Sequence, residues 1–139
     1  MHDTVGDVGI FTENRILLAE DVEINRDIMM ALLEHTGIFI DQAVDGIDAF
    51  EKYLNSPDRY DLILMDIHMP NMDGYETTKR IRGSALPGAD KIPIIALTAN
   101  TFQEDINRCL ACGMNKHIGK PVDAGAVIAI LKEYLLYGK

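Results

Sequence analysis

The chain has 139 residues, of which 47% are apolar, so it can form one domain with a substantial core and is not a disordered chain. Its net charge of −9, from 13 basic and 22 acidic residues, argues against nucleic-acid binding, which needs clusters of Lys and Arg. No apolar run is long enough to cross a bilayer, and the first residues lack the pattern of a signal peptide. We therefore expect a cytoplasmic domain without direct membrane contact.

Short apolar runs alternate with helical periods five times along the chain, after residues 1–14, which we expect to be a flexible lead-in or linker. Strands are predicted at residues 15–19, from 38–40 onward, at 62–65, at 92–97 and at 116–119. Helices are predicted at residues 25–36, 47–54, 75–82, 102–110 and from 124 to about 134. This alternation indicates one α/β domain over residues 15–137. We expect a doubly wound, flavodoxin-like parallel sheet of five strands in the order 2-1-3-4-5, with helices on both faces.

Polar side chains follow four of these predicted strands. Glu20 and Asp21 end the first strand, Asp66 ends the third, and Thr98 and Lys120 follow the fourth and fifth. The ends of the first and third strands meet at the switch point of such a sheet, so these side chains should share one pocket. Three carboxylates about 5 Å apart would repel one another by about 3 kcal/mol per pair, which calls for a cation. A partly hydrated oxygen site suits Mg²⁺ better than zinc.

The predicted pocket has the components of a phosphoryl-accepting site. An ionised Asp66 beside Mg²⁺ and Lys120 could attack a phosphoryl group and form an acyl phosphate. The metal ion and the ammonium group would stabilise the charge on the phosphoryl oxygens, and Thr98 could donate its hydroxyl to them.

Four motifs of the chain resemble those of the receiver domain of two-component response regulators, over residues 15–134. They are Leu18-Ala19-Glu20-Asp21, Leu64-Met65-Asp66-Ile67-His68-Met69-Pro70-Asn71-Met72-Asp73-Gly74, Ala96-Leu97-Thr98-Ala99 and Gly119-Lys120-Pro121. The resemblance implies that Asp66 is the phosphoacceptor and a metal ligand. It also implies that Asp21 binds Mg²⁺ directly, that Glu20 acts on the metal through water, and that His68 contributes its backbone carbonyl.

The same resemblance assigns the switch of the domain. Thr98 and Lys120 would contact the phosphoryl group, and the Lys120–Pro121 peptide bond would be cis. His117 occupies the second switch position, where the family usually has Tyr or Phe. The sequence departs from the family pattern at this residue.

Three segments further resemble receivers that are fused to hybrid sensor histidine kinases. They are residues 20–26, the loop of residues 83–91 and the Gly119-Lys120-Pro121-Val122 ending. The implied partners are a histidine kinase or a histidine phosphotransfer domain, and a homodimer could form through the fourth helix, fifth strand and fifth helix. The implied function is to accept a phosphoryl group from phosphohistidine and either switch conformation or pass the group on.

The sequence also allows other interpretations. The chain could be a stand-alone, single-domain response regulator. A haloacid-dehalogenase-type phosphatase would need a second Asp two residues after the nucleophile, where this chain has His68. Cys109 and Cys112 form a C-x-x-C motif near a predicted helix C-terminus, so we interpret them as core or surface thiols rather than a redox or zinc pair.

Overall fold

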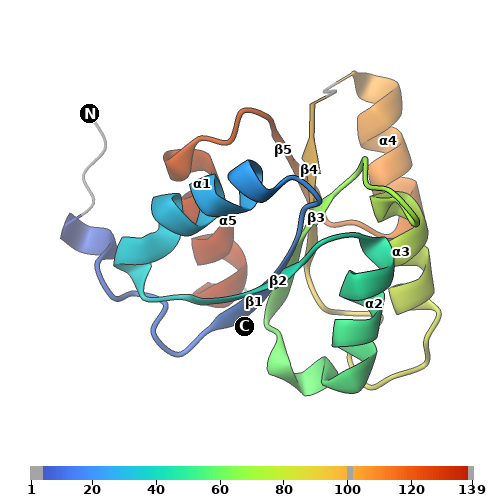
Figure 1. Cartoon of the computed structure of the whole chain (residues 1–139). Coiled ribbons are helices and arrows are strands. Elements are labelled where there is room, and N and C mark those ends of the chain that lie inside the picture. Colours follow the sequence, from blue (N-terminus) through green and yellow to red (C-terminus); the bar gives the residue numbers. More distant parts are fainter. Residues whose placement is uncertain (1–4, 100–101, 138–139) are drawn as a thin grey trace.

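Five parallel strands form one sheet in the order β2-β1-β3-β4-β5, which confirms the predicted topology (Figure 1). The computed structural model describes residues 5–99 and 102–137. The strands are β1 (Arg15–Ala19), β2 (Phe39–Ala43), β3 (Leu62–Asp66), β4 (Ile94–Thr98) and β5 (Lys116–Gly119). The helices are α1 (Glu23–Leu33), α2 (Gly46–Asn55), α3 (Gly74–Arg82), α4 (Gln103–Cys112) and α5 (Ala124–Leu135), with short 3-10 helices η1 (Val5–Asp7), η2 (Glu34–Thr36) and η3 (Pro57–Arg59).

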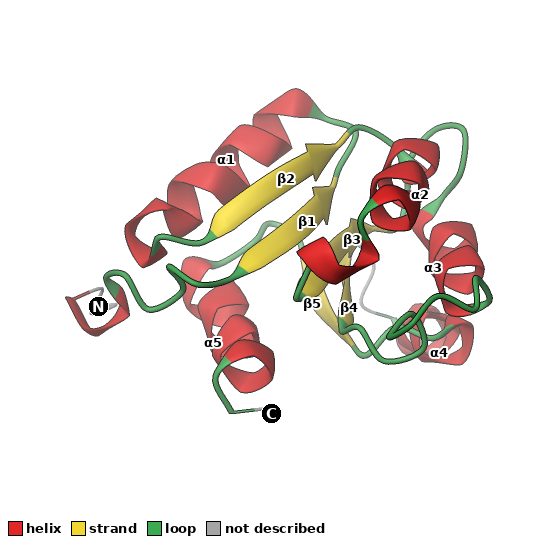
Figure 2. Cartoon of the chain, turned by 90° about the horizontal axis from the view of Figure 1, so that it is seen from below, coloured by secondary structure: helices red, strands yellow, loops and turns green. Residues whose placement is uncertain are grey.

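The helices cover both faces of the sheet and create two separate cores. Helices α1 and α5 lie on one face, and α2, α3 and α4 lie on the other (Figures 1 and 2). Alternate residues of β1 enter different cores: Leu17 packs on the α2–α4 side and Leu18 on the α1–α5 side. Because both faces are covered, all five residues of β3 are buried. This explains why the central strands are continuous apolar runs rather than alternating ones.

The register of the sheet brings the predicted site residues to one edge. Ala19 pairs with Met65, so the next residue of each strand, Glu20 and Asp66, lies at the same level. Thr98 pairs with Gly119, the residue before Lys120. The carboxyl ends of β1, β3, β4 and β5 therefore meet at the same edge.

The start of the chain differs from the flexible lead-in that we expected, over its described part. Phe11 is fully buried in the α1–α5 core, and its backbone N–H donates to the Thr36 carbonyl over 2.9 Å. The Asp7 carboxylate, which is 3% exposed, pairs with Lys132 of α5 at 2.7 Å. A single aromatic residue in a glycine-containing stretch has no period, so the sequence pattern did not predict this packing. Residues 1–4 lie outside the described part.

Helix α1 presents an apolar surface to solvent. Its apolar residues recur at helical spacing, which normally marks the buried face. However, Met29 and Leu33 are the buried ones, whereas Ile24 and Ile28 are 61% and 48% exposed. None of the helices in the described ranges has both the length and the apolar character to cross a membrane.

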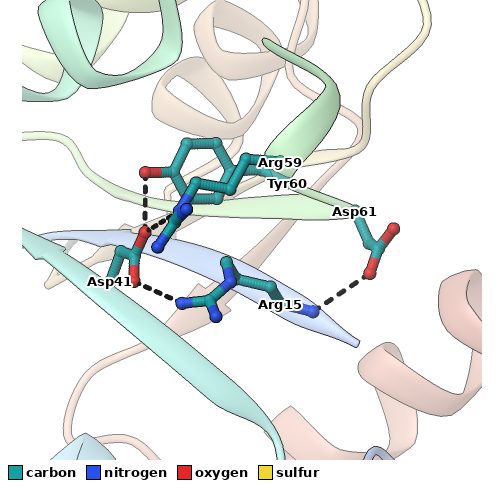
Figure 3. A network of polar contacts seen from close by, with 5 residues as sticks. All are labelled: Arg15, Asp41, Arg59, Tyr60 and Asp61. Atoms are coloured by element: carbon teal, nitrogen blue, oxygen red, sulfur yellow. Dashed lines mark hydrogen bonds and ion pairs between the residues drawn. The ribbon is translucent and has the colours of Figure 1, made fainter. Parts of the chain in front are cut away.

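A network of charged residues ties together β1, β2 and the segment before β3 (Figure 3). The Asp41 carboxylate of β2 accepts hydrogen bonds from Arg15 at 2.7 Å, Arg59 at 2.7 Å and the Tyr60 hydroxyl at 2.9 Å. Asp61 accepts from the backbone N–H of Arg15 at 3.0 Å. Partial burial alone would raise the pKa of Asp41, but the bonds from Arg59, Tyr60 and Arg15 outweigh it and lower the pKa. These hydrogen bonds thus stabilise the ionised Asp41 at a partly buried position of the edge strand β2.

Candidate phosphorylation and metal site

Three acidic side chains converge at the carboxyl ends of β1 and β3. Glu20, Asp21 and Asp66 each offer one carboxylate oxygen, and these oxygens lie within 4.8 Å of one another. Glu20 is 2% exposed and Asp66 is 4% exposed, whereas Asp21 is partly open to solvent. The structure therefore brings together the three predicted acidic residues.

Lys120 joins two of these carboxylates. Its Nζ lies 2.9 Å from Glu20 Oε1 and 3.1 Å from Asp66 Oδ1. The backbone N–H of Lys120 donates to the Thr98 carbonyl over 2.8 Å, which fixes the chain that carries the ammonium group. The Lys120–Pro121 peptide bond is cis, as the resemblance implied. The Lys120 ammonium thus faces two of the three acids of the cluster.

The protonation of the pocket is unequal between the two buried acids. Burial raises the pKa of Asp66, and the adjacent Glu20 raises it further, although Lys120 opposes the shift. Burial also acts to raise the pKa of Glu20, but hydrogen bonds from Lys120 and from the backbone N–H of Val22 outweigh it and lower the pKa. The environment therefore shifts the pKa of Asp66 upward and the pKa of Glu20 downward.

The donor set of the pocket fits Mg²⁺. All candidate ligand atoms are oxygens, and the cluster is partly exposed at Asp21, which leaves access for the water that Mg²⁺ retains. The two cysteines do not belong to the site. They are buried in α4, and this burial raises the pKa of both thiols, so neither is disposed to be a thiolate ligand.

The loop after β3 is held tightly over residues 67–73. The backbone N–H of Gly74 donates to the Ile67 carbonyl over 2.8 Å, and a Cβ at Gly74 would overlap the Asp66 carbonyl oxygen. The Asp73 side chain caps α3 by accepting from the Glu76 N–H at 2.9 Å. His68, predicted to contribute its carbonyl to the metal, is exposed near the start of this loop.

The two predicted switch residues lie on neighbouring strands. Thr98 ends β4 and is 3% exposed. His117 of β5 pairs with Ala96, two residues before Thr98, and is half-buried. Ala96 belongs to the core on the α2–α4 side, and paired residues of a sheet share a face. His117 therefore lies on the face that α4 covers.

Sequence reasoning missed one residue beside the pocket. The Arg26 guanidinium of α1 donates to the Glu20 backbone carbonyl over 2.7 Å. This bond holds the chain at the point where β1 ends and the acidic pair begins. The sequence does show a cation in the first turn of the helix that comes after Glu20 and Asp21. That pattern alone does not indicate which atom the cation contacts.

Comparison with known proteins gives the family of this arrangement. The family model of the response regulator receiver domain matches residues 16–132. Hybrid signal transduction histidine kinase L of Dictyostelium discoideum is 37% identical over 125 residues, which cover 86% of this chain and 7% of that protein. The chain likewise spans 15% of the length of probable histidine kinase 1 of Oryza sativa subsp. indica and 5% of hybrid signal transduction histidine kinase M of Dictyostelium discoideum.

Solved structures share the fold, among them two at a TM-score of 0.79. One is the receiver domain of the sensor histidine kinase PA1611 from Pseudomonas aeruginosa PAO1, with magnesium in its active-site cleft; it is 38% identical, and the match covers 88% of this chain and 97% of that one. The other is a co-crystal of the Saccharomyces cerevisiae histidine phosphotransfer protein Ypd1 with the receiver domain of Ssk1. It is 29% identical, and the match covers 87% of this chain and 88% of that one.

Proposed function

The chain belongs to the response regulator receiver domain family, and we propose that it accepts a phosphoryl group on Asp66 within a histidine-kinase phosphorelay. The observation that carries this proposal is the position of the Asp66 carboxylate. It ends a buried strand, 3.1 Å from the Lys120 ammonium and beside two further acids. A carboxylate that is buried next to a fixed cation and a metal-binding cluster is suited to nucleophilic attack on phosphorus.

Each residue of the pocket has a role in this proposal. An Asp66 oxygen forms the new bond to phosphorus while the phosphorus–nitrogen bond of a phosphohistidine breaks and its electron pair returns to the imidazole. Lys120 and the Thr98 hydroxyl bind the transferred phosphoryl oxygens. Asp21, Asp66 and the His68 carbonyl would hold Mg²⁺, with Glu20 acting through water. Bound Mg²⁺ would neutralise the acids and stabilise charge on the phosphoryl oxygens.

Asp66 must be ionised in order to react, and the pocket balances two opposing effects on it. Burial and Glu20 raise its pKa and so favour the unreactive, protonated form. Lys120 lowers the pKa of Asp66, and a cation bound by the acidic cluster would lower it further. The reaction should therefore depend on the metal ion.

A histidine phosphotransfer domain is the partner that we propose, and the exposed face of α1 is the surface for it. Val22, Ile24 and Ile28 are 43–61% exposed at the rim of the site. Next to them a cavity of about 130 Å³ reaches Glu20 and Lys120. Because the phosphohistidine must approach Asp66, its protein has to cover this rim, and a helical surface would bury the apolar side chains there.

The context of the domain is part of the same proposal. Because the chain spans a small fraction of its histidine-kinase relatives, we propose that it serves as the receiver module of a hybrid sensor histidine kinase, in the cytoplasm, with residues 15–137 as its functional unit. A stand-alone response regulator is the second candidate. The homodimer expected through α4, β5 and α5 remains a prediction.

The test is phosphorylation by a small acyl phosphate, followed by intact-protein mass spectrometry. We expect the wild-type chain to gain one phosphoryl group in the presence of Mg²⁺ and none with excess chelator. Asp66→Asn should abolish the gain, whereas Asp58→Asn, the same change at an exposed position in η3, should leave it intact. Undiminished labelling of Asp66→Asn would contradict the proposal.

A further inference from the structure

The loop between β3 and α3 contains a residue with unusual backbone geometry. Asn71 has a φ of 70°, and the N–H of Met72 donates to the carbonyl of Pro70 over 2.7 Å. A hydrogen bond across a single residue with this φ is typical of a γ-turn of the rare, strained kind. Such a turn persists only where its surroundings stabilise it, although Asn tolerates positive φ better than most residues.

A side-chain bond to a neighbouring loop stabilises this turn. The Asn71 side-chain amide donates to Asp45 Oδ2 over 2.7 Å. The other oxygen of the same carboxylate, Oδ1, accepts from the backbone N–H of Asp48 at 2.7 Å and caps α2. Asp45 therefore connects the start of α2 with the β3–α3 loop, through a solvent-exposed hydrogen bond whose acceptor is a carboxylate.

The backbones of the two segments are also in close contact. A Cβ added at Gly46, the first residue of α2, would overlap the carbonyl oxygen of Met72 and the hydroxyl of Thr77. The chain therefore has room only for glycine where α2 begins. This contact lies one residue from the Asn71–Asp45 bond on each segment, and both hold the same loop against α2.

We propose that the Asn71–Asp45 bond is a latch that positions the β3–α3 loop for Mg²⁺ binding, an inference that rests on the proposed function of the site. The loop runs from Asp66 to Gly74 and includes His68, the residue whose carbonyl is the proposed ligand. A ligand's apparent affinity falls in proportion to the fraction of protein in the binding-competent conformation. Neither latch residue contacts the metal ion in this proposal, so both are positioning residues.

Two substitutions break the latch and keep the local structure on each side of it. Asn71→Gly removes the amide but still accommodates the positive φ, and Asp45→Ser removes the acceptor of Asn71 but can still cap α2. We expect each to weaken Mg²⁺ binding about threefold to tenfold, as measured by calorimetric titration. We expect the double variant to bind Mg²⁺ with the same affinity as the single variant that has the lower affinity, because both substitutions remove the same bond.

Two controls separate the latch from charge and from general destabilisation. Asp48→Asn removes one charge from the same turn without contacting Asn71, and it should change the affinity less than Asp45→Ser does. Exchanging the two residues, Asp45→Asn together with Asn71→Asp, restores a bond between amide and carboxylate and should recover most of the affinity. A purely structural role would lower the free energy of unfolding and leave the Mg²⁺ affinity unchanged.

The outcomes distinguish this inference from the function on which it rests. If wild type binds Mg²⁺ and both Asn71→Gly and Asp45→Ser bind it equally well, the latch is overturned and the proposed function stands. Weaker Mg²⁺ binding in Asp45→Ser but not in Asn71→Gly would also overturn the latch, because the loss of the Asp45 charge would then explain the change. If wild type itself neither binds Mg²⁺ nor accepts a phosphoryl group, both proposals fall. The expected result is weaker Mg²⁺ binding in both single variants, with phosphorylation of Asp66 recovered at saturating Mg²⁺.

Discussion

The Asp66 carboxyl should destabilise the metal-free protein above neutral pH, so Asp66→Asn should stabilise it there. Burial first, and then the adjacent Glu20, raise the pKa of Asp66 from 3.8 to about 7 in the folded protein. The folded state thus binds this proton more tightly than the unfolded chain does. The free energy of unfolding should therefore decrease as the pH rises from about 4 to about 7, and then level off.

The size of the effect follows from the interval between the two pKa values. Each pH unit in this interval lowers the free energy of unfolding by about 1.4 kcal/mol, so the destabilisation by Asp66 at pH 8 can reach at most about 4 kcal/mol. Because Glu20 shares the interaction, we expect the variant to gain about 1–3 kcal/mol. Lys120 keeps its ion pair with Glu20 at 2.9 Å in the variant, so the substitution does not leave a buried cation unpaired.

The assay is urea unfolding of wild type and Asp66→Asn in chelator at pH 5 and pH 8. The other titratable groups are the same in both proteins and largely cancel in the difference, so the advantage of the variant should be larger at pH 8. Added Mg²⁺ should then stabilise wild type by mass action and reduce the difference between the two proteins. The reasoning is refuted if Asp66→Asn is the less stable protein at pH 8 without metal, or if the difference is the same at both pH values.

Two further predictions concern the charged network and the switch. Asp41→Asn should lower the free energy of unfolding by about 1–2 kcal/mol at pH 7. Because the pKa of Asp41 is lowered in the folded protein, this loss should shrink as the pH falls below about 4. An equal loss at pH 3, measured by urea unfolding, would contradict a stabilising role for the ionised Asp41. A phosphate-mimicking beryllium fluoride complex should shift the amide NMR signals of α4 and β5 more than those of α2. His117→Ala should weaken that response and His117→Tyr should preserve it; a stronger response in α2 would place the output surface elsewhere.

The sequence predicted the features that depend on short stretches of chain. Continuous apolar runs predicted the buried strands, and the polar residues that follow them predicted the pocket, because parallel strands end at a common edge. Asp66 and Lys120 are 54 positions apart, yet their carboxylate and ammonium lie 3.1 Å from each other as this rule requires. The separate roles of the acids and of Thr98 are predictions that rest on family resemblance.

The sequence did not predict the contacts that depend on the exact position of one segment against another. Asn71 and Asp45 belong to different loops, and neither has a local pattern that names the other as its partner. The same holds for Asp41, whose partners lie on β1 and before β3. An acid in the middle of a strand, such as Asp41, predicts an exposed edge strand. In the structure, two guanidinium groups and a phenol hydroxyl bind its carboxylate.

The packing of residues 5–14 changes the reach of any domain joined to the N-terminal side of this one. A free stretch of ten residues spans about 17 Å on average as a flexible chain, and up to about 33 Å when extended. With Phe11 buried and Asp7 paired to Lys132, that length is taken up along the surface near α5 and is not available as a tether. In a fused protein, the tether to a preceding domain would then start before residue 5, close to α5, and the residues before residue 5 would set the effective concentration of that domain at Asp66.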